Sequence, residues 1–202
     1  MVICLFGASS DKIRQSYLES VERFGELLAK AGHTLLFGAG ATGLMGAAAR
    51  GTKRGGGKVI GISPTFFDTD GILYDKCDEM IYTETMHERK ALLRGKADAF
   101  AIVPGGIGTF DEFFEVLTLR QLGVMDKPIG ILNLEGVYDP LLTLLDKTIE
   151  NGFMSEECRV LWHSENDPAA LLAYLEKAAT EAPRGKNYAF LTIPEAGHET
   201  EV

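Results

Sequence analysis

Short apolar runs alternate with longer amphipathic stretches along most of the chain. The short runs are typical of strands that are buried in a parallel sheet. The longer stretches place apolar residues every three to four positions, as on one face of a helix. We expect strands at residues 2–7, 33–38, 58–62, 80–83, 99–103 and 128–132. We expect helices at residues 13–31, 44–54, 88–96, 109–122, 140–151 and 168–178.

This alternation of strand and helix predicts right-handed βαβ units. The expected fold is therefore α/β, a single-domain, doubly wound (Rossmann-like) parallel sheet with helices on both faces. Helix-end signals agree with it: Asp11 near the first start, Asp139 as a cap before Pro140, and Gly32 as a stop. Because no repeat or linker interrupts the pattern, we expect one domain over residues 1–180 and a polar tail over residues 181–202.

The overall charge and the cysteines narrow the classes of partner. A formal net charge of −9 argues against nucleic acid or an anionic membrane, because both require a basic surface. The three cysteines are far apart and lack CxxC spacing, so we expect reduced thiols. The four histidines are scattered, which predicts no metal site. Without a leader-like start or a membrane-length apolar run, the expected location is the cytoplasm.

The most informative segment is the glycine-rich stretch at residues 104–112, which directly follows the predicted strand at residues 99–103. Glycines allow backbone N–H groups to approach a ligand with no Cβ in the way. The start of the following helix favours a phosphate, and we expect Asp111 and Glu112 in its first turn. A phosphate cradle beside a carboxylate predicts an enzyme that acts on a phosphorylated substrate.

Two other turns follow predicted strands, where ligands bind in such sheets. In residues 7–10, Ser9 and Ser10 could donate to a phosphate or a ribose hydroxyl, or one could simply cap a helix. Residues 38–46 superficially match a GxGxxG fingerprint, but no acidic residue follows the next strand until Asp68. We therefore interpret that turn as close helix–strand packing with a contribution to a pocket wall, and a nicotinamide cofactor is disfavoured.

Arg89 and Lys90 lie at the start of a predicted helix, where the helix dipole disfavours cations. Their position is easier to understand if they face an anion, although either could be solvated or ion-paired. The segment follows the fourth predicted strand, which we expect to lie beside the fifth. His87 is interpreted as a helix cap or a surface residue.

These segments resemble the motifs of the Lonely guy proteins, which are cytokinin-activating nucleoside-monophosphate phosphoribohydrolases. The family's PGGxGT(x)xE loop stands here at residues 104–112, and its upstream MHxRK segment at residues 86–90. The resemblance runs from about Val2 to Leu175 and includes three further segments: residues 7–10, 43–46 and 121–130.

The resemblance implies a nucleotide-binding domain that hydrolyses the N-glycosidic bond of a nucleoside 5′-monophosphate. The substrate would be AMP or an N6-modified adenosine monophosphate, and the products would be free base and ribose 5-phosphate. The resemblance implies no cofactor. It makes Arg89 and Glu112 catalytic. It also implies a homodimer whose site can borrow residues from the neighbouring subunit. The expected substrate-binding residues are Ser9, Ser10, Gly43, Met86, Lys90, Gly105, Gly106, Ile107, Gly108, Thr109, Asp111 and Thr118.

The chain departs from the family pattern at three places. Ile107 replaces a common tyrosine, and Asp111 replaces a common glutamate with a shorter carboxylate. Residues 64–67 lack a polar residue that some members use near the substrate. An apolar lid over a purine is a plausible substitute there.

The same chemistry follows from the residues. Breaking a ribosyl C1′–N bond passes through an oxocarbenium-like cation, which a nearby carboxylate stabilises while it accepts a proton from water. Glu112 suits this role if residues 105–109 anchor the phosphate. One alternative is a non-catalytic carrier of a nucleotide or pterin on the same fold. A lysine decarboxylase is disfavoured, because it needs pyridoxal phosphate on an isolated lysine and Arg89 adjoins Lys90.

Overall fold

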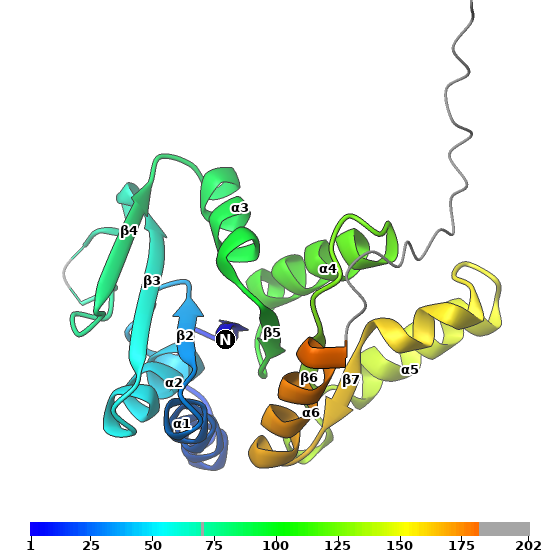
Figure 1. The fold of residues 1–202 in the computed structure, drawn as a ribbon, viewed down its shortest axis with the longest axis horizontal. Helices are drawn as coiled ribbons and strands as arrows, with labels where there is room; N and C mark the ends of the chain where they lie inside the picture. The colour runs from blue at the N-terminus through cyan, green and yellow to red at the C-terminus, as the bar shows by residue number, and fades with distance from the viewer. Residues whose placement is uncertain (70, 182–202) are drawn as a thin grey trace, which may run out of the picture.

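The computed structural model describes residues 1–69 and 71–181 of the chain. The strands form a single parallel sheet of seven strands in the order β4-β3-β2-β1-β5-β6-β7 (Figure 1). The α/β doubly wound fold is therefore confirmed. The strands are β1 (Val2–Phe6), β2 (Thr34–Phe37), β3 (Lys58–Pro64), β4 (Glu79–Thr83), β5 (Ala99–Ile102), β6 (Ile129–Leu132) and β7 (His163–Glu165).

Helices cover both faces of the sheet, as predicted (Figure 1). The α-helices are α1 (Gln15–Lys30), α2 (Gly43–Arg54), α3 (Met86–Lys96), α4 (Ile107–Gln121), α5 (Asp139–Glu150) and α6 (Pro168–Glu181). Short 3₁₀ segments are η1 (Thr65–Phe67), η2 (Leu134–Gly136) and η3 (Glu156–Leu161). Apart from Glu181, the predicted polar tail lies outside the described residues.

Each face of the sheet has its own apolar core. Ile3 and Leu5 of β1 pack in the cluster that includes α1, α2 and α6. Cys4 and Phe6 point to the opposite face and pack with α3, α4 and α5. Successive side chains of a strand alternate between faces, so a strand that is buried on both reads as a continuous apolar run. Five of the six predicted strands have this character, and β4 is half-buried at one sheet edge. Strand β7, at the other edge, is short, polar and half-buried, and it was missed.

The predicted helix ends are partly right. Gly32 follows α1 with a φ of 77°, and its amide donates to Ala29 O at 2.9 Å, as expected of a stop. Asp11 is not the cap of α1, which begins after Arg14 without a side-chain cap. Asp139 is the first residue of α5 and not its cap, because the helix begins at Asp139 and Tyr138 occupies the cap position. The Asp139 carboxylate accepts a hydrogen bond from Asn133 Nδ2 at 2.7 Å instead.

Helix α3 begins two residues earlier than predicted. Thr85 precedes it and accepts a hydrogen bond from the Glu88 amide, while the Glu88 side chain bonds back to the Thr85 amide. This capping box fixes the helix start. His87 is exposed in the first turn and does not cap the helix, which leaves its interpretation as a surface residue.

Strands β4 and β5 are not neighbours, contrary to the prediction. The chain winds outward from β1 to β4 at the sheet edge, then returns to place β5 on the other side of β1. Helix α3 makes this crossing and packs over β3 and β1. The order in which the chain adds strands therefore switches sides between β1 and β5. Sheets of this kind bind ligands at such a point, beyond the carboxyl ends of their strands.

No α-helix within the described part of the chain combines the length and the apolar character that crossing a membrane requires.

Candidate active site

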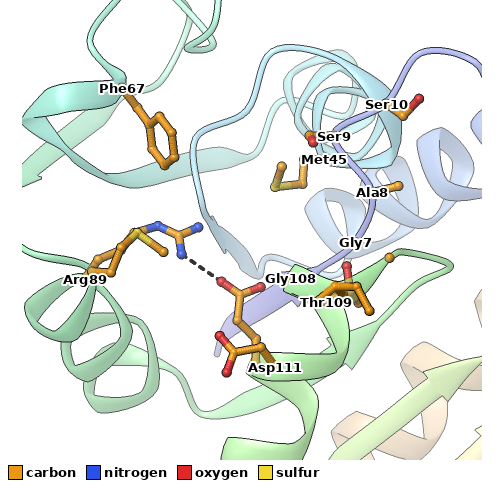
Figure 2. A pocket seen from close by; sticks show the side chains of 14 residues that line it. Gly7, Ala8, Ser9, Ser10, Met45, Phe67, Arg89, Gly108, Thr109 and Asp111 are labelled. Carbon is orange, nitrogen blue, oxygen red and sulfur yellow. Dashed lines mark hydrogen bonds and ion pairs between the residues drawn. The ribbon is translucent and has the colours of Figure 1, made fainter.

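A pocket of about 430 Å³ lies beyond the carboxyl ends of the strands at this switch point (Figure 2). Its walls come from the turns after β1 and β3, from the first turns of α2 and α3, and from the first two turns of α4 with the residue before it. Fourteen residues line it: Gly7, Ala8, Ser9, Ser10, Met45, Phe67, Met86, Arg89, Gly106, Ile107, Gly108, Thr109, Asp111 and Glu112.

The N-terminus of α4 offers backbone donors to the pocket. Phe110 is the first residue of the turn whose amide has a backbone partner, Gly106 O at 3.0 Å. The three preceding amides of the helix have no backbone partner among the described residues. A Cβ added at Gly106 or Gly108 would meet no protein atom within 4 Å. These glycines therefore leave open the space in which an anion can reach the amides.

Gly105 has a different task and does not line the pocket. A Cβ there would lie 2.0 Å from Thr109 Oγ1. The absence of a side chain lets the buried Thr109 pack tightly against the loop. Gly105 thus shapes the loop from behind.

The turn after β1 closes the pocket opposite α4. The Ala8 amide donates to Pro104 O at 3.0 Å, and Ala8 O accepts from the Leu44 amide at 2.9 Å. Gly43 has a φ of 60°, and a Cβ there would lie 2.5 Å from Ala8 O. Gly43 therefore lets α2 approach this turn closely, while Ser9 and Ser10 line the pocket.

Arg89 is held in a fixed position although it reaches across the sheet from α3. Its side chain is 9% exposed, Nε donates to Ile62 O at 3.2 Å, and Nη1 donates to Glu112 Oε1 at 2.8 Å (Figure 2). A Cβ at Gly38 would lie 1.9 Å from Arg89 Nη2. The missing side chain of Gly38 therefore makes the space that the guanidinium fills.

Glu112 combines burial with an ion pair. Burial of its carboxyl group raises the pKa of Glu112, and the Arg89 guanidinium works against this rise. Because α4 begins at Ile107, Asp111 and Glu112 lie in its second turn and not, as predicted, in the first. The first turn of α4 carries no acidic residue, so no carboxylate competes there for the free amides.

The remaining wall is apolar and includes residues that sequence reasoning did not select. Phe67 comes from η1 after β3, and its ring points into the pocket (Figure 2). Met45 of α2 and Met86 of α3 complete this wall. The apolar character of residues 64–67 suggested a lid, and the turns at residues 7–10 and 38–46 were expected near the pocket. Gly7, Ala8 and Met45 of these turns line the pocket although none of them was named as a contact.

Comparison with known proteins shows to which family the chain belongs. A family model described as "Possible lysine decarboxylase" matches residues 45–175. A cytokinin riboside 5′-monophosphate phosphoribohydrolase of Arabidopsis thaliana, LOG2, is 39% identical over 87% of this chain and 82% of its own length. The enzyme LOG of Oryza sativa subsp. japonica, with the same activity in its name, is 36% identical over 89% of this chain and 74% of its own length. The chain belongs to the Lonely guy family of phosphoribohydrolases.

Solved structures with this fold include proteins outside the phosphoribohydrolases. A molybdenum cofactor carrier protein from Chlamydomonas reinhardtii matches with a TM-score of 0.68, covering 89% of this chain and 98% of that chain, at 23% identity. A molybdenum cofactor binding protein from Rippkaea orientalis matches with a TM-score of 0.67, covering 87% and 95%, at 22% identity. At this level of identity the likeness shows the shared fold alone.

The pocket gathers most, but not all, of the residues that the Lonely guy motifs indicated. Arg89 and Glu112 meet, and eight expected substrate-binding residues line the same space: Ser9, Ser10, Met86, Gly106, Ile107, Gly108, Thr109 and Asp111. Gly43 and Gly105 lie behind it as backbone supports. Lys90 lies outside it and bonds to carboxylates of α4, and Thr118 is exposed further along that helix.

Proposed function

We propose that this protein hydrolyses the N-glycosidic bond of a nucleoside 5′-monophosphate, releasing free base and ribose 5-phosphate. The favoured substrates are AMP and N6-modified adenosine monophosphates, as the names of its cytokinin riboside 5′-monophosphate relatives suggest. The observation that carries the proposal is the buried Arg89–Glu112 pair, which shares one pocket with the free amides of α4.

The phosphate would bind at the N-terminus of α4. Its amides and the positive end of the helix dipole suit a dianion, and Gly106 and Gly108 leave room for it. Ser9 and Ser10 are hydroxyl donors on the opposite wall. Binding energy from the phosphate can then orient a bond that lies elsewhere in the substrate.

Glu112 would act on the anomeric carbon. As C1′–N breaks, its ionised carboxylate stabilises the positive charge on the ribosyl group and accepts a proton from the attacking water. The water oxygen bonds to C1′, and the bonding electrons leave with the base, which gains a proton from solvent. Glu112 then releases its proton to solvent, which restores the ionised carboxylate. Burial makes Glu112 a stronger base than an exposed glutamate, and the Arg89 ion pair orients the carboxylate.

The base would lie against Phe67, Met45 and Met86. An aromatic ring stacks on a planar purine, and methionine thioethers adapt to an apolar substituent. This apolar wall favours purines, including those that carry a hydrocarbon group at N6.

We further propose a homodimer formed through α4 and the turn after it. Ile107 is 82% exposed at the start of α4, and Leu122 and Val124, after its end, are 51% and 71% exposed, so apolar side chains at both ends of α4 face solvent. Thr118 lies exposed on the same helix, where it could serve a neighbouring subunit's site. Light scattering coupled to gel filtration tests the dimer itself: a mass of twice 22.0 kDa supports it and a monomer contradicts it.

Two other functions have weaker support. A carrier role rests on a fold that is shared at low identity, and it gives no reason to bury a carboxylate opposite an anion site. A lysine decarboxylase needs a lysine free to form a Schiff base, whereas Lys90 is ion-paired to Asp111 and Glu115.

The proposal is tested by chromatography of the base released from a panel of nucleoside monophosphates. Glu112→Gln should lower adenine release from AMP by about 10²- to 10⁴-fold, while ribose 5-phosphate still binds. Glu150→Gln, at an exposed site on α5, is the matched control and should behave as wild type. Near-normal release by Glu112→Gln would refute the role of Glu112, and wild-type protein that binds AMP without cleaving it would favour a carrier.

A further inference from the structure

A set of ion pairs joins α3 to α4 beside the Arg89–Glu112 pair. Lys90 Nζ lies 3.0 Å from Asp111 Oδ2 and 2.9 Å from Glu115 Oε2. Arg94 Nη1 continues the set at 2.6 Å from Glu115 Oε1. We call these four residues, Lys90, Arg94, Asp111 and Glu115, the inter-helix ladder.

The ladder is more than a chance surface pair. The side chain of Lys90 is only 18% exposed and that of Glu115 27%. Isolated exposed ion pairs contribute little, whereas a connected, partly buried network holds its geometry better. Burial acts against the charge of Lys90, yet the carboxylates of Glu115 and Asp111 outweigh it, so the pKa of Lys90 is raised.

The sheet alone does not fix α3 against α4. Helix α3 joins β4 to β5 and α4 follows β5, so the chain ties the end of α3, and not its first turn, to the strand that α4 follows. Leu93 and Phe113 pack the two helices into one apolar cluster, but apolar contact is not directional and tolerates sliding. The ladder supplies directional links between the helices.

The ladder adjoins the proposed catalytic pair in both helices. Lys90 follows Arg89 directly in α3, and Asp111 precedes Glu112 directly in α4. A shift of one helix along the other would therefore change the distance between Arg89 Nη1 and Glu112 Oε1, which is now 2.8 Å. Lys90 itself does not line the pocket.

We propose that Lys90 is a positioning residue, which locks α3 to α4 through Asp111 and Glu115 and so sets the geometry of Arg89 and Glu112. This inference rests on the proposed function and assigns Lys90 a role other than contact with the substrate. Displacement of a catalytic group by about 1 Å can cost about 10²-fold in rate. Loss of the ladder should therefore act on kcat and leave substrate binding nearly unchanged.

The test compares Lys90→Met, Lys90→Arg and Glu115→Gln in AMP hydrolysis. We expect Lys90→Met to lower kcat by about 10- to 100-fold, while KM for AMP and the inhibition constant of ribose 5-phosphate stay within about twofold. Lys90→Arg keeps the charge and should retain most of the activity. Glu115→Gln lies outside the pocket but should lower kcat as well, and its effect should not add to that of Lys90→Met. Lys96→Met, at an exposed site on α3, is the control and should match wild type.

A rise in KM and in the ribose 5-phosphate inhibition constant, with kcat unchanged, would overturn the inference and make Lys90 a substrate ligand. Wild-type protein without any base release would instead overturn the proposed function. A crystal structure of Lys90→Met decides the positioning claim in either case. An Arg89–Glu112 distance beyond hydrogen-bond reach supports it, and a distance still at 2.8 Å contradicts it.

Discussion

Replacing Gly38 by alanine tests whether activity depends on where the Arg89 guanidinium sits. The new methyl group would lie 1.9 Å from Arg89 Nη2, whereas ordinary contact begins near 3.4 Å. The guanidinium would thus have to move by about 1.5 Å to relieve the overlap. Its bonds to Glu112 Oε1 at 2.8 Å and Ile62 O at 3.2 Å do not survive a shift of that size.

Stability and activity should respond differently to this change. The atom that the methyl group meets is the end of a flexible side chain next to an open pocket, so the fold can adjust at a cost of about 1–3 kcal/mol. Activity should fall by about 10²-fold, because the ion pair that orients Glu112 is lost.

Gly95→Ala is the matched control for Gly38→Ala. Gly95 lies in α3, and a Cβ there would meet nothing within 4 Å. Since alanine is a better helix former than glycine, this variant should be slightly more stable and fully active. The measurements are adenine release from AMP and thermal unfolding. A Gly38→Ala variant with wild-type kcat/KM would refute the reasoning, because the guanidinium would then be free to act from another position.

Three further predictions concern other parts of the pocket and its support. Burial raises the pKa of Glu112 above the ordinary 4.5, and protonation removes the ionised base, so kcat/KM for AMP should fall as the pH is lowered through that raised value. A pH profile in which kcat/KM falls only below pH 4.5 would contradict this. Phe67→Ala should weaken AMP binding by about 1–3 kcal/mol through lost stacking and leave ribose 5-phosphate binding unchanged. Phe153→Ala, at an exposed site outside the pocket, is its control. Equal losses for AMP and ribose 5-phosphate would rule out a base contact. Tyr138→Phe removes the buried hydrogen bond to Val103 O at 2.8 Å and should cost about 1 kcal/mol in thermal unfolding without loss of turnover, whereas an unchanged melting temperature would show that this bond contributes nothing.

The sequence predicted the sheet because strands that are buried on both faces consist of consecutive apolar residues. Every residue of β5 is buried, and the side chains of β1 alternate between two cores, so both strands read as unbroken apolar runs. Strand β7 has no such apolar run, since it is polar and half-buried at the edge of the sheet. The edge position of β4 was also missed, because strand order depends on where α3 crosses the sheet and local periodicity does not report that path.

The sequence predicted which residues gather around the pocket where they are close in the chain, and it did not predict which way more distant side chains point. The glycine loop and Glu112 are close in sequence, so their meeting could be expected. The start of α4 at Ile107 was misplaced by two residues, because glycine at position 108 argues against a helix unless space for a ligand is needed there. The inward turn of Phe67 depends on η1, which no pattern in the sequence marked.

The most direct test of the central claim is a crystal structure of Glu112→Gln with AMP bound. The account predicts phosphate oxygens within hydrogen-bond distance of the Gly108 and Thr109 amides, the base against Phe67, and C1′ facing the side chain at position 112. AMP bound with its phosphate away from the start of α4, or with C1′ turned from position 112, would contradict it.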